Sequence, residues 1–244
     1  MKTWAVGDIH GCVAEIRELV ASFNLQPEDR ICFVGDYTDR GPDCSGVLTF
    51  IEKLSKQNTV FAVLGNHDDK YTRYAADLEK KRLDPTYEIS IGLTPDKQLE
   101  FQKLTPENLK FLSSLPNWVR ISANAVPWII VHAGLQPHIP IQCQNESKLK
   151  HLRYLNKNTL KPVQKSDENS VFWTEVYNLH YNVAYGHHAH SFENIEVFVN
   201  ADGKKLIGLD TGCCFGAYLS GYCLETGEII QIKAKEIYRK SEEF

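Results

Sequence analysis

The sequence has no stretch of about 18 consecutive apolar residues, so we expect no membrane-spanning helix. We expect no signal peptide either, because Trp4–Val6 already has the character of a β-strand and the charged Asp8 follows at once. An excess of positive charge is also missing, since 27 Lys and Arg stand against 31 Asp and Glu, a net charge of −4. General binding to nucleic acid or to anionic lipid is therefore not expected, and only a local basic patch stays open.

Signals for cysteine pairing are missing too. The seven cysteines are an odd number, and no two of them have C-x-x-C spacing. This favours free, mostly buried thiols in a reducing cytoplasm, which is the predicted location. The adjacent Cys213 and Cys214 leave a redox site open as a less favoured alternative. No internal repeat, low-complexity segment or linker interrupts the chain, so we predict a single domain over residues 1–244.

Short apolar runs alternate with segments of helical periodicity in the first part of the chain. Trp4–Val6, Ile31–Val34 and Val60–Leu64 are continuously apolar, which is typical of strands covered on both faces in a mostly parallel sheet. The segments after the first two runs have apolar residues at helical spacing, as at Val13 and Ile16. The pattern predicts an α/β fold.

Later segments have different characters. Residues 69–120 are rich in charge, and Thr105-Pro106 is a good helix start, so we predict a mostly helical excursion that either selects substrates or covers sheet edges. Residues 138–170 are polar and are predicted to be irregular, and residues 235–244 are predicted to form a frayed tail. Two antiparallel hairpins are expected near the end, Ile195–Val199 with Leu206–Leu209 and Tyr218–Leu224 with Ile229–Ile232.

Five of the apolar runs end in clusters of residues that can bind metal ions. The clusters are Gly7-Asp8-Ile9-His10-Gly11, Gly35-Asp36-Tyr37-Thr38-Asp39-Arg40-Gly41, Gly65-Asn66-His67-Asp68, His132-Ala133-Gly134 and Gly186-His187-His188. Each cluster alone could be an ordinary turn, but five in order at strand ends indicate one site, because ligands bind at the carboxyl ends of strands in α/β sheets. Hydrolysis of a phosphoester at two divalent metals is the chemistry that fits.

The ligands divide between two ions. Asp8 and His10 alternate in one extended loop and can face the first ion, while Asp36 is the candidate for a bridge. The second ion would take ligands from three further strand ends, Asn66, His132 and His187. Mixed oxygen and nitrogen ligands suit Mn, our first choice, and also Fe, Zn or Ni.

These residues resemble the calcineurin-like metallophosphoesterases, and most closely their phosphoprotein phosphatase superfamily. The signature motifs of that superfamily match Gly7–Gly11, Gly35–Gly41 and Gly65–Asp68, and its two downstream ligands match His132–Gly134 and Gly186-His187. The resemblance runs from about residue 3 to about residue 215. It implies a two-sheet β sandwich flanked by helices, with two metals held by the ligands named above.

The resemblance also implies roles for residues between the ligands. His67 would be the general acid that protonates the leaving oxygen, and Asp39 would orient it. Arg40 would grip the phosphate oxygens, and Arg153 resembles the second phosphate arginine of bacterial members, although it could be an ordinary surface arginine. A catalytically inactive binding scaffold is disfavoured, because such a domain would lack some of these residues.

The chain departs from other calcineurin-like enzymes near its last ligand. Position 189 is Ala where many members have a second His, so His188 and His190 fall out of register and are not expected to be ligands. This supports the phosphoprotein phosphatase branch. The segment Asp210–Gly216 resembles the bacterial and phage members rather than the eukaryotic ones.

Two substrate classes share this chemistry. One is phosphoserine or phosphothreonine in proteins, and the other is dinucleoside polyphosphates such as diadenosine tetraphosphate, or RNA caps. Symmetrical diadenosine tetraphosphatases resemble this chain but usually have Asn at the position of Asp39. On that residue we favour a phosphorylated protein as the partner, with a small phosphoester as the alternative.

Overall fold

Three parallel strands form the centre of the first sheet. The computed structural model describes residues 1–240. The strands β1 (Thr3–Val6), β2 (Arg30–Phe33) and β3 (Thr59–Ala62) are parallel, as predicted. The antiparallel pair β12 (Tyr218–Cys223) and β13 (Ile229–Lys233) extends the sheet beyond β1, in the order β13-β12-β1-β2-β3. The second predicted hairpin is therefore present, at one edge of this sheet.

The second sheet has the same mixed character. Its centre is the parallel set β5 (Val126–Val131), β9 (Asn182–Tyr185) and β11 (Lys205–Gly208). The strands β4 (Trp118–Ala123) and β10 (Glu196–Val199) are antiparallel edges, in the order β10-β11-β9-β5-β4. The runs predicted to be parallel therefore form the centres of the sheets, and the two predicted hairpins, β12 with β13 and β10 with β11, are antiparallel at their edges.

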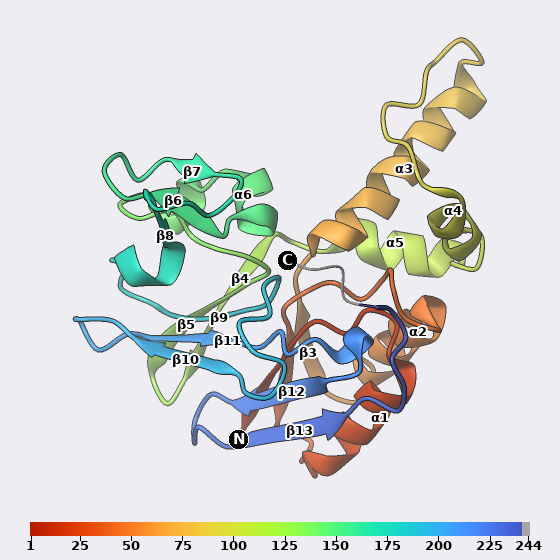
Figure 1. Cartoon of the computed structure of the whole chain (residues 1–244). Coiled ribbons are helices and arrows are strands. Elements are labelled where there is room, and N and C mark those ends of the chain that lie inside the picture. Colours follow the sequence, from red (N-terminus) through yellow and green to blue (C-terminus); the bar gives the residue numbers. More distant parts are fainter. Residues whose placement is uncertain (241–244) are drawn as a thin grey trace.

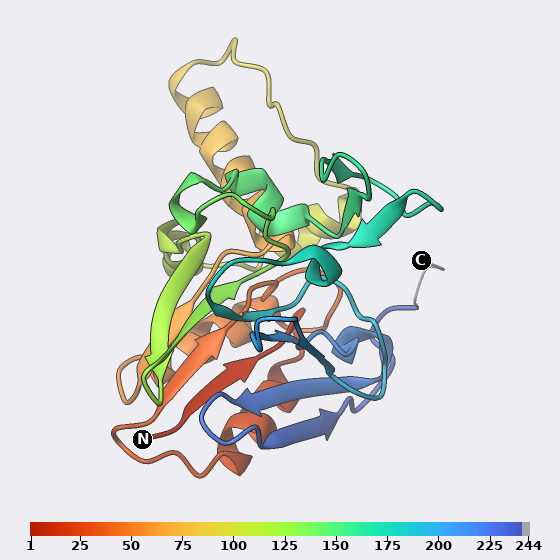
Figure 2. The same ribbon diagram turned by 90° about the vertical axis from the view of Figure 1, so that its left-hand side faces the viewer.

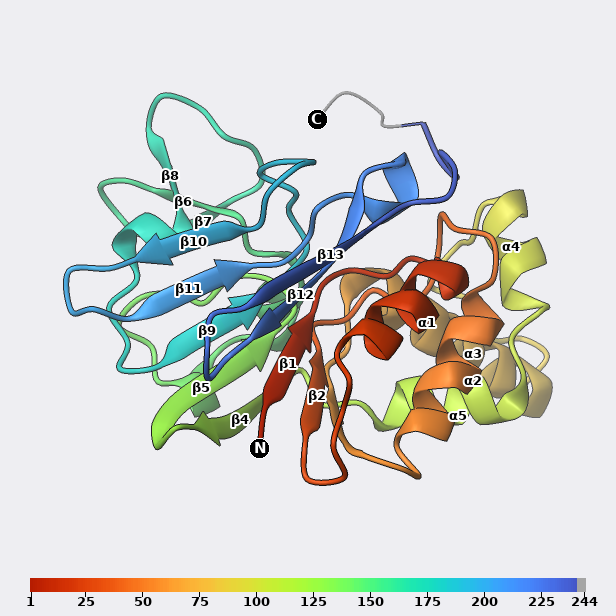
Figure 3. The same cartoon turned by 90° about the horizontal axis from the view of Figure 1, so that it is seen from below.

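The two sheets pack face to face, and helices cover the outer face of the first one (Figure 3). Ala5 faces the other sheet and meets Trp128 in the core between them, whereas Trp4, its neighbour in β1, belongs to the core beneath the helices. That core is closed by α1 (Val13–Ser22) and α2 (Cys44–Leu54). The fold is the two-sheet α/β sandwich flanked by helices that the sequence and its resemblance predict.

The outer face of the second sheet has its own cover. Here α6 (Glu146–His151) and a three-stranded sheet, β7-β6-β8, lie where an irregular segment was predicted. The bounds of its strands and of the nearby 3₁₀ helices are β6 (Tyr154–Asn156), β7 (Pro162–Val163), β8 (Ser170–Phe172), η1 (Ile141–Cys143) and η2 (Trp173–Val176). The prediction was wrong because strands of two or three residues are too short to show a periodic pattern.

The helical excursion consists of three helices, the first of which begins at the candidate ligand Asn66. They are α3 (Asn66–Leu83), α4 (Pro95–Phe101) and α5 (Pro106–Ser114). Thr105 caps α5 by accepting a hydrogen bond from the backbone N–H of Asn108, as its position before Pro106 predicts. The far end of α3 stands clear of the sheets in two perpendicular views (Figures 1 and 2). Among residues 1–240, no helix is both long and apolar enough to cross a membrane.

Asp77 ties the loop after α3 back to the helix. Its carboxylate accepts hydrogen bonds from Tyr87 Oη and from both the backbone N–H and the hydroxyl of Ser90. We expect Asp77→Ala to open this loop, so that trypsin cleaves after Lys81 and Arg82 several-fold faster than in the wild type. Limited proteolysis with mass spectrometry measures the rate, and an unchanged rate would show that other contacts hold the loop.

The last described residues are packed against the body rather than frayed. The backbone N–H of Lys235 and the hydroxyl of Tyr238 both donate to Glu15 in α1, and the backbone N–H of Arg239 donates to Cys214. Cys214 itself belongs to the short helix η3 (Cys213–Phe215). The remainder of the predicted tail, residues 241–244, lies outside the described residues.

Candidate metal centre

The five clusters of candidate ligands meet at one place, but they come from two sheets and not from one. Those of Asp8, Asp36 and Asn66 follow β1, β2 and β3 of the first sheet. Those of His132 and His187 follow β5 and β9 of the second. The backbone N–H of His187 donates to the Asp8 carboxylate at 3.1 Å, which joins the two groups. The site therefore lies where the two sheets present their carboxyl ends together.

Backbone strain is concentrated in these loops. Left-handed φ angles, which non-glycine residues rarely adopt, occur at His10 (45°), Asp36 (53°), Asp39 (70°), Arg40 (77°) and His187 (71°). Each such residue costs of the order of 1 kcal/mol or more, and such strain clusters at functional sites. The loops are fixed by hydrogen bonds, including two from the N–H groups of Ile9 and His10 to the carbonyl of Asp36. The strained backbone aims the side chains toward a common centre.

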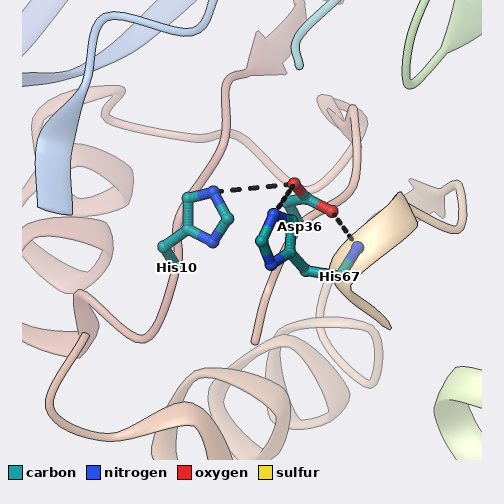
Figure 4. A group of neighbouring side chains, drawn as sticks. All are labelled: His10, Asp36 and His67. Carbon is teal, nitrogen blue, oxygen red and sulfur yellow. Dashed lines mark hydrogen bonds and ion pairs between the residues drawn. The ribbon is translucent and has the colours of Figure 1, made fainter. Parts of the chain in front are cut away.

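Asp36 occupies that centre. It is 1% exposed, and its Oδ1 accepts a hydrogen bond from the backbone N–H of His67 at 3.0 Å. Its other oxygen, Oδ2, lies 3.5 Å from His10 Nε2 and 3.4 Å from His132 Nε2. Figure 4 shows this carboxylate in contact with His10 and His67. Asp36 Oδ2 thus faces one histidine proposed for each ion. This is the position that a bridging ligand would need.

Backbone carbonyl groups orient the imidazoles of His10 and His132. His10 Nδ1 lies 2.9 Å from the carbonyl of Thr38, and His132 Nδ1 lies 2.9 Å from the carbonyl of Val34. When Nδ1 donates to a carbonyl, the Nε2 lone pair is left for a metal, which is the usual support of a metal-binding histidine. The fold thus presets the tautomer that a ligand needs.

Asn66 lies close to the two histidines of the second sheet, which are the other ligands predicted for the second ion. Its Oδ1 lies 2.9 Å from both His132 Nε2 and His187 Nδ1. Two atoms that each bind one ion at about 2.1 Å are roughly 3.0 Å apart at a right angle and 3.4 Å apart at a tetrahedral angle. The four distances among Asn66, Asp36 and the imidazoles, 2.9 to 3.5 Å, lie within about 0.1 Å of this range. The residues therefore fit divalent ions of the type predicted.

Two groups of potential ligand atoms satisfy the distances for one ion each. The first is His10, Asp36 and His67, and the second is Asp8, Asp36 and His132. Both contain Asp36, in keeping with a bridge. Asp8 is grouped here with His132, whereas the sequence assigned it to the ion of His10.

The pKa values of the candidate ligands are shifted by burial and by the charges of their neighbours. Burial lowers the pKa of His132, but the Asp36 carboxylate more than offsets this and raises that pKa to about 9. Burial lowers the pKa of His10 to about 3, with Arg40 acting in the same direction. Burial also opposes ionisation of Asp36, yet the imidazoles around it hold its pKa well below the usual range. A divalent ion and a proton would compete for His132, because a histidine must be deprotonated to bind a metal.

His67 is tied to Asp39 beside this centre. Its Nδ1 lies 2.6 Å from Asp39 Oδ2, while its Nε2 faces the site, 4.0 Å from Asp36 Oδ2. Burial raises the pKa of Asp39, but hydrogen bonds and charge from His67 and Lys97 hold that pKa below its usual range. Because Asp39 holds Nδ1, the other ring nitrogen, Nε2, is the atom of His67 that faces the site and could pass a proton to a substrate.

Comparison with known proteins identifies the family. The family model described as calcineurin-like phosphoesterase matches residues 1–219. The chain belongs to this family. As a calcineurin-like phosphoesterase it is a metal-dependent hydrolase of phosphoesters, which confirms the coarser part of the predicted function.

Two similar sequences and one similar structure have names of tetraphosphatases. The chain is 26% identical to a protein of Oceanobacillus iheyensis called bis(5'-nucleosyl)-tetraphosphatase PrpE, asymmetrical, over 97% of this chain and 94% of the relative. It is 25% identical to the symmetrical bis(5'-nucleosyl)-tetraphosphatase of Wigglesworthia glossinidia brevipalpis, over 96% and 100%. A crystal structure described as "a putative diadenosine tetraphosphatase" is 26% identical, with a TM-score of 0.76 over 96% and 93% of the two chains.

Both predicted arginines of this phosphoesterase reach the site. Arg40 Nη1 donates to His10 Nε2 at 3.0 Å, and its guanidinium lies over the ring of Phe215. Arg153 Nη2 donates to the carbonyl of His187 at 3.1 Å, and its buried Nε has no hydrogen-bond partner among the described residues. Arg153 also lines a cavity of about 510 Å³ together with His187. From this position Arg153 could bind a phosphate group in the cavity.

The histidines beside Ala189 have other partners. His188 Nε2 lies 3.4 Å from the hydroxyl of Tyr154, and His190 Nε2 lies 3.0 Å from Glu196. Neither joins the groups of atoms that could bind an ion among the described residues. That they are not ligands of this phosphoesterase stays a prediction.

Three acidic residues at the site have no role assigned from the sequence, although two of them, Asp68 and Asp210, lie in segments that the resemblance covers. Asp68 accepts hydrogen bonds from Thr38 and from the backbone N–H groups of Tyr37 and Gly65, and so fixes the loop of Asp36. Asp210 is close enough to Asp8 for their charges to interact, and burial raises its pKa. Asp210 follows an apolar strand directly, as Asp8 does, and this signal could have identified it. Glu100 in α4, which accepts from the backbone N–H of Asp39, has no such signal.

Proposed function

We propose that this chain hydrolyses dinucleoside tetraphosphates of the diadenosine tetraphosphate type at a dinuclear metal centre. The observation that carries the proposal is similarity from end to end with relatives of that name, two of which align over at least 94% of their own length. The site supports it, because the atoms of Asp8, Asp36, His10 and His132 are spaced as ligands of two divalent ions would be. Manganese remains our first choice of metal.

The comparisons favour the substrate that the sequence placed second. Asp39 predicts protein substrates in the sequence, but its surroundings give another reason for a carboxylate at this position. Asp39 Oδ2 contacts both His67 and Lys97, so a neutral Asn would leave the Lys97 ammonium without its anion and the ring of His67 without its carboxylate partner. The identity of this residue therefore follows from local charge balance and does not report on the substrate.

The proposed reaction is an in-line displacement at one phosphorus atom. When bound, the two ions supply a hydroxide at neutral pH and neutralise charge on the phosphoryl oxygens. Arg40 and Arg153 would hold those oxygens through charge-assisted hydrogen bonds. His67, with Nδ1 fixed by Asp39, would give the proton on Nε2 to the leaving oxygen, and water would later restore that proton.

A substrate panel tests this proposal. The metal-free protein is supplied in turn with Mn, Fe, Zn or Ni and offered diadenosine tetraphosphate, capped RNA, p-nitrophenyl phosphate and phosphoserine or phosphothreonine peptides. We expect kcat/KM to be roughly 10²-fold higher for the tetraphosphate than for the peptides, because the rest of the substrate contributes binding energy at the transition state. Chromatography of the products shows which bond is cut.

Chelated protein without added metal is the control and should be inactive with every substrate. Phosphate release from the phosphopeptides alone would contradict the proposal and restore the protein phosphatase. Release from none of the substrates with any metal would contradict both.

A further inference from the structure

A small basic cavity opens beside the proposed general acid. Its volume is about 160 Å³, and its lining includes His67, Lys70, Arg73, Lys97 and His151. These side chains come from α3, from α4 and from the C-terminal end of α6. The segment that contains α3 and α4 is the excursion whose purpose the sequence did not reveal.

The geometry of α3 places its cations in a row that starts at the metal centre. Lys70 and Arg73 follow Asn66 at i+4 and i+7, a spacing that keeps all three on one face of a helix. Each turn of the helix advances about 5.4 Å, so the row extends roughly two turns away from the site. A chain of phosphates that leaves the metal centre along α3 would meet one cation per turn.

The charges in this cavity do not cancel. Asp69 also lines it, but the ammonium group of Lys150 lies 2.6 Å from its carboxylate and balances that charge. Lys97 contacts Asp39 and is balanced by it in the same way. Arg73 lies 3.8 Å from Asp69, yet 60% of its side chain is exposed, which leaves it weakly engaged. Lys70 and Arg73 together supply the excess of positive charge.

A second cavity lies on the other side of the centre. It measures about 510 Å³ and is lined by Arg153, His187 and Lys148, among others. Asn66 and His151 line both cavities, so the two meet at the candidate ligands. Only the small cavity contains His67, the residue that would protonate the leaving oxygen. The two cavities can therefore be assigned to the two halves of a substrate.

On the basis of the function proposed above, we infer that the small cavity is a subsite for the leaving nucleotide, in which Lys70 and Arg73 bind its phosphates. In the reaction, the oxygen of water bonds to the attacked phosphorus and the bond from that phosphorus to the leaving phosphate breaks. The leaving phosphate carries off the electron pair and takes a proton from His67. The large cavity then holds the retained phosphoryl group and its nucleoside. A phosphomonoester with no further phosphates makes no use of the row of cations.

The test compares two substrates in one double variant, Lys70→Ala with Arg73→Ala. We expect the ratio of kcat/KM for diadenosine tetraphosphate to that for p-nitrophenyl phosphate to fall roughly 10- to 100-fold, since each charge-assisted contact is worth about tenfold in affinity. The inhibition constant of the nucleotide product should rise in this variant, because the product loses the same two contacts. The dependence of KM on salt should also become shallower, because two cations no longer attract the anion.

A matched control separates this effect from a general loss of positive charge. Lys53 in α2 and Lys110 in α5 are exposed helix residues that line neither cavity, so Lys53→Ala with Lys110→Ala removes the same charge elsewhere. We expect this control to keep the wild-type ratio. A ratio within twofold of the wild type in the Lys70 and Arg73 variant would overturn the subsite. Failure of the wild type to cleave the tetraphosphate would instead overturn the proposed function.

Discussion

Replacing Asp36 by Asn is expected to release both metal ions together and to lower kcat/KM by about 10³-fold or more. One carboxylate oxygen lies 3.5 Å from His10 Nε2 and 3.4 Å from His132 Nε2, so the same atom serves both proposed ions. Two bound ions stabilise the transition state by several kcal/mol, and each 1.36 kcal/mol is a factor of ten in rate. Metal content by elemental analysis and kcat/KM at saturating Mn measure the two effects.

The matched control for that variant is Asp202→Asn. Asp202 lies in the exposed turn between β10 and β11, and its backbone N–H donates to Asn200. We expect it to keep two ions and full activity. If Asp36→Asn kept two ions at full occupancy, Asp36 could not be the bridge. The loss of a single ion would assign Asp36 to that ion alone.

The fold was largely predictable because its central strands are short, continuous apolar runs. The Trp4–Val6 run is buried on both faces, and a continuous apolar run of this kind can be recognised in the sequence as a central strand. The number of sheets was not predictable from the runs, since an apolar strand does not reveal its neighbours. The division into two sheets arises from pairing between distant segments, such as β1 with β12.

Part of the candidate site was predictable for a similar reason. Asp8, Asp36 and Asn66 stand directly after strands, and the carboxyl ends of parallel strands meet at one edge. Lys97 and Glu100 have no such marker. Both reach Asp39 from a seven-residue helix in the excursion, and only the tertiary path of that segment brings them there.

Substrate preference depended on a single residue and was therefore the weakest prediction. Asp39 contacts His67 and is not among the residues that line either cavity beside the site. What separates a polyphosphate from a phosphopeptide is the space beside the metals, and α3, α4 and α6 form that space together. The spacing of residues along the chain does not predict that side chains from three separate segments line one cavity.

His67→Asn is expected to lower kcat by about 10² to 10⁴-fold while the metal content stays at the wild-type level. The Nδ1 atom of His67 is held by Asp39 at 2.6 Å, which leaves Nε2 as the atom that delivers the proton. The backbone N–H of His67 that donates to Asp36 is kept in the variant, so the bridge should stay in position. Steady-state kinetics at saturating Mn and elemental analysis check the two halves of this expectation.

The size of the loss should depend on the leaving group, and this distinguishes an acid from a merely structural residue. Phenol is a weaker acid than p-nitrophenol, so phenyl phosphate needs a proton on its leaving oxygen more than p-nitrophenyl phosphate does. We therefore expect His67→Asn to slow phenyl phosphate by at least about tenfold more than p-nitrophenyl phosphate. A phosphate that leaves from a tetraphosphate is itself a stable anion, so its hydrolysis should be closer to the p-nitrophenyl case. Equal losses for both aryl substrates would mean that His67 positions the phosphate and does not donate the proton.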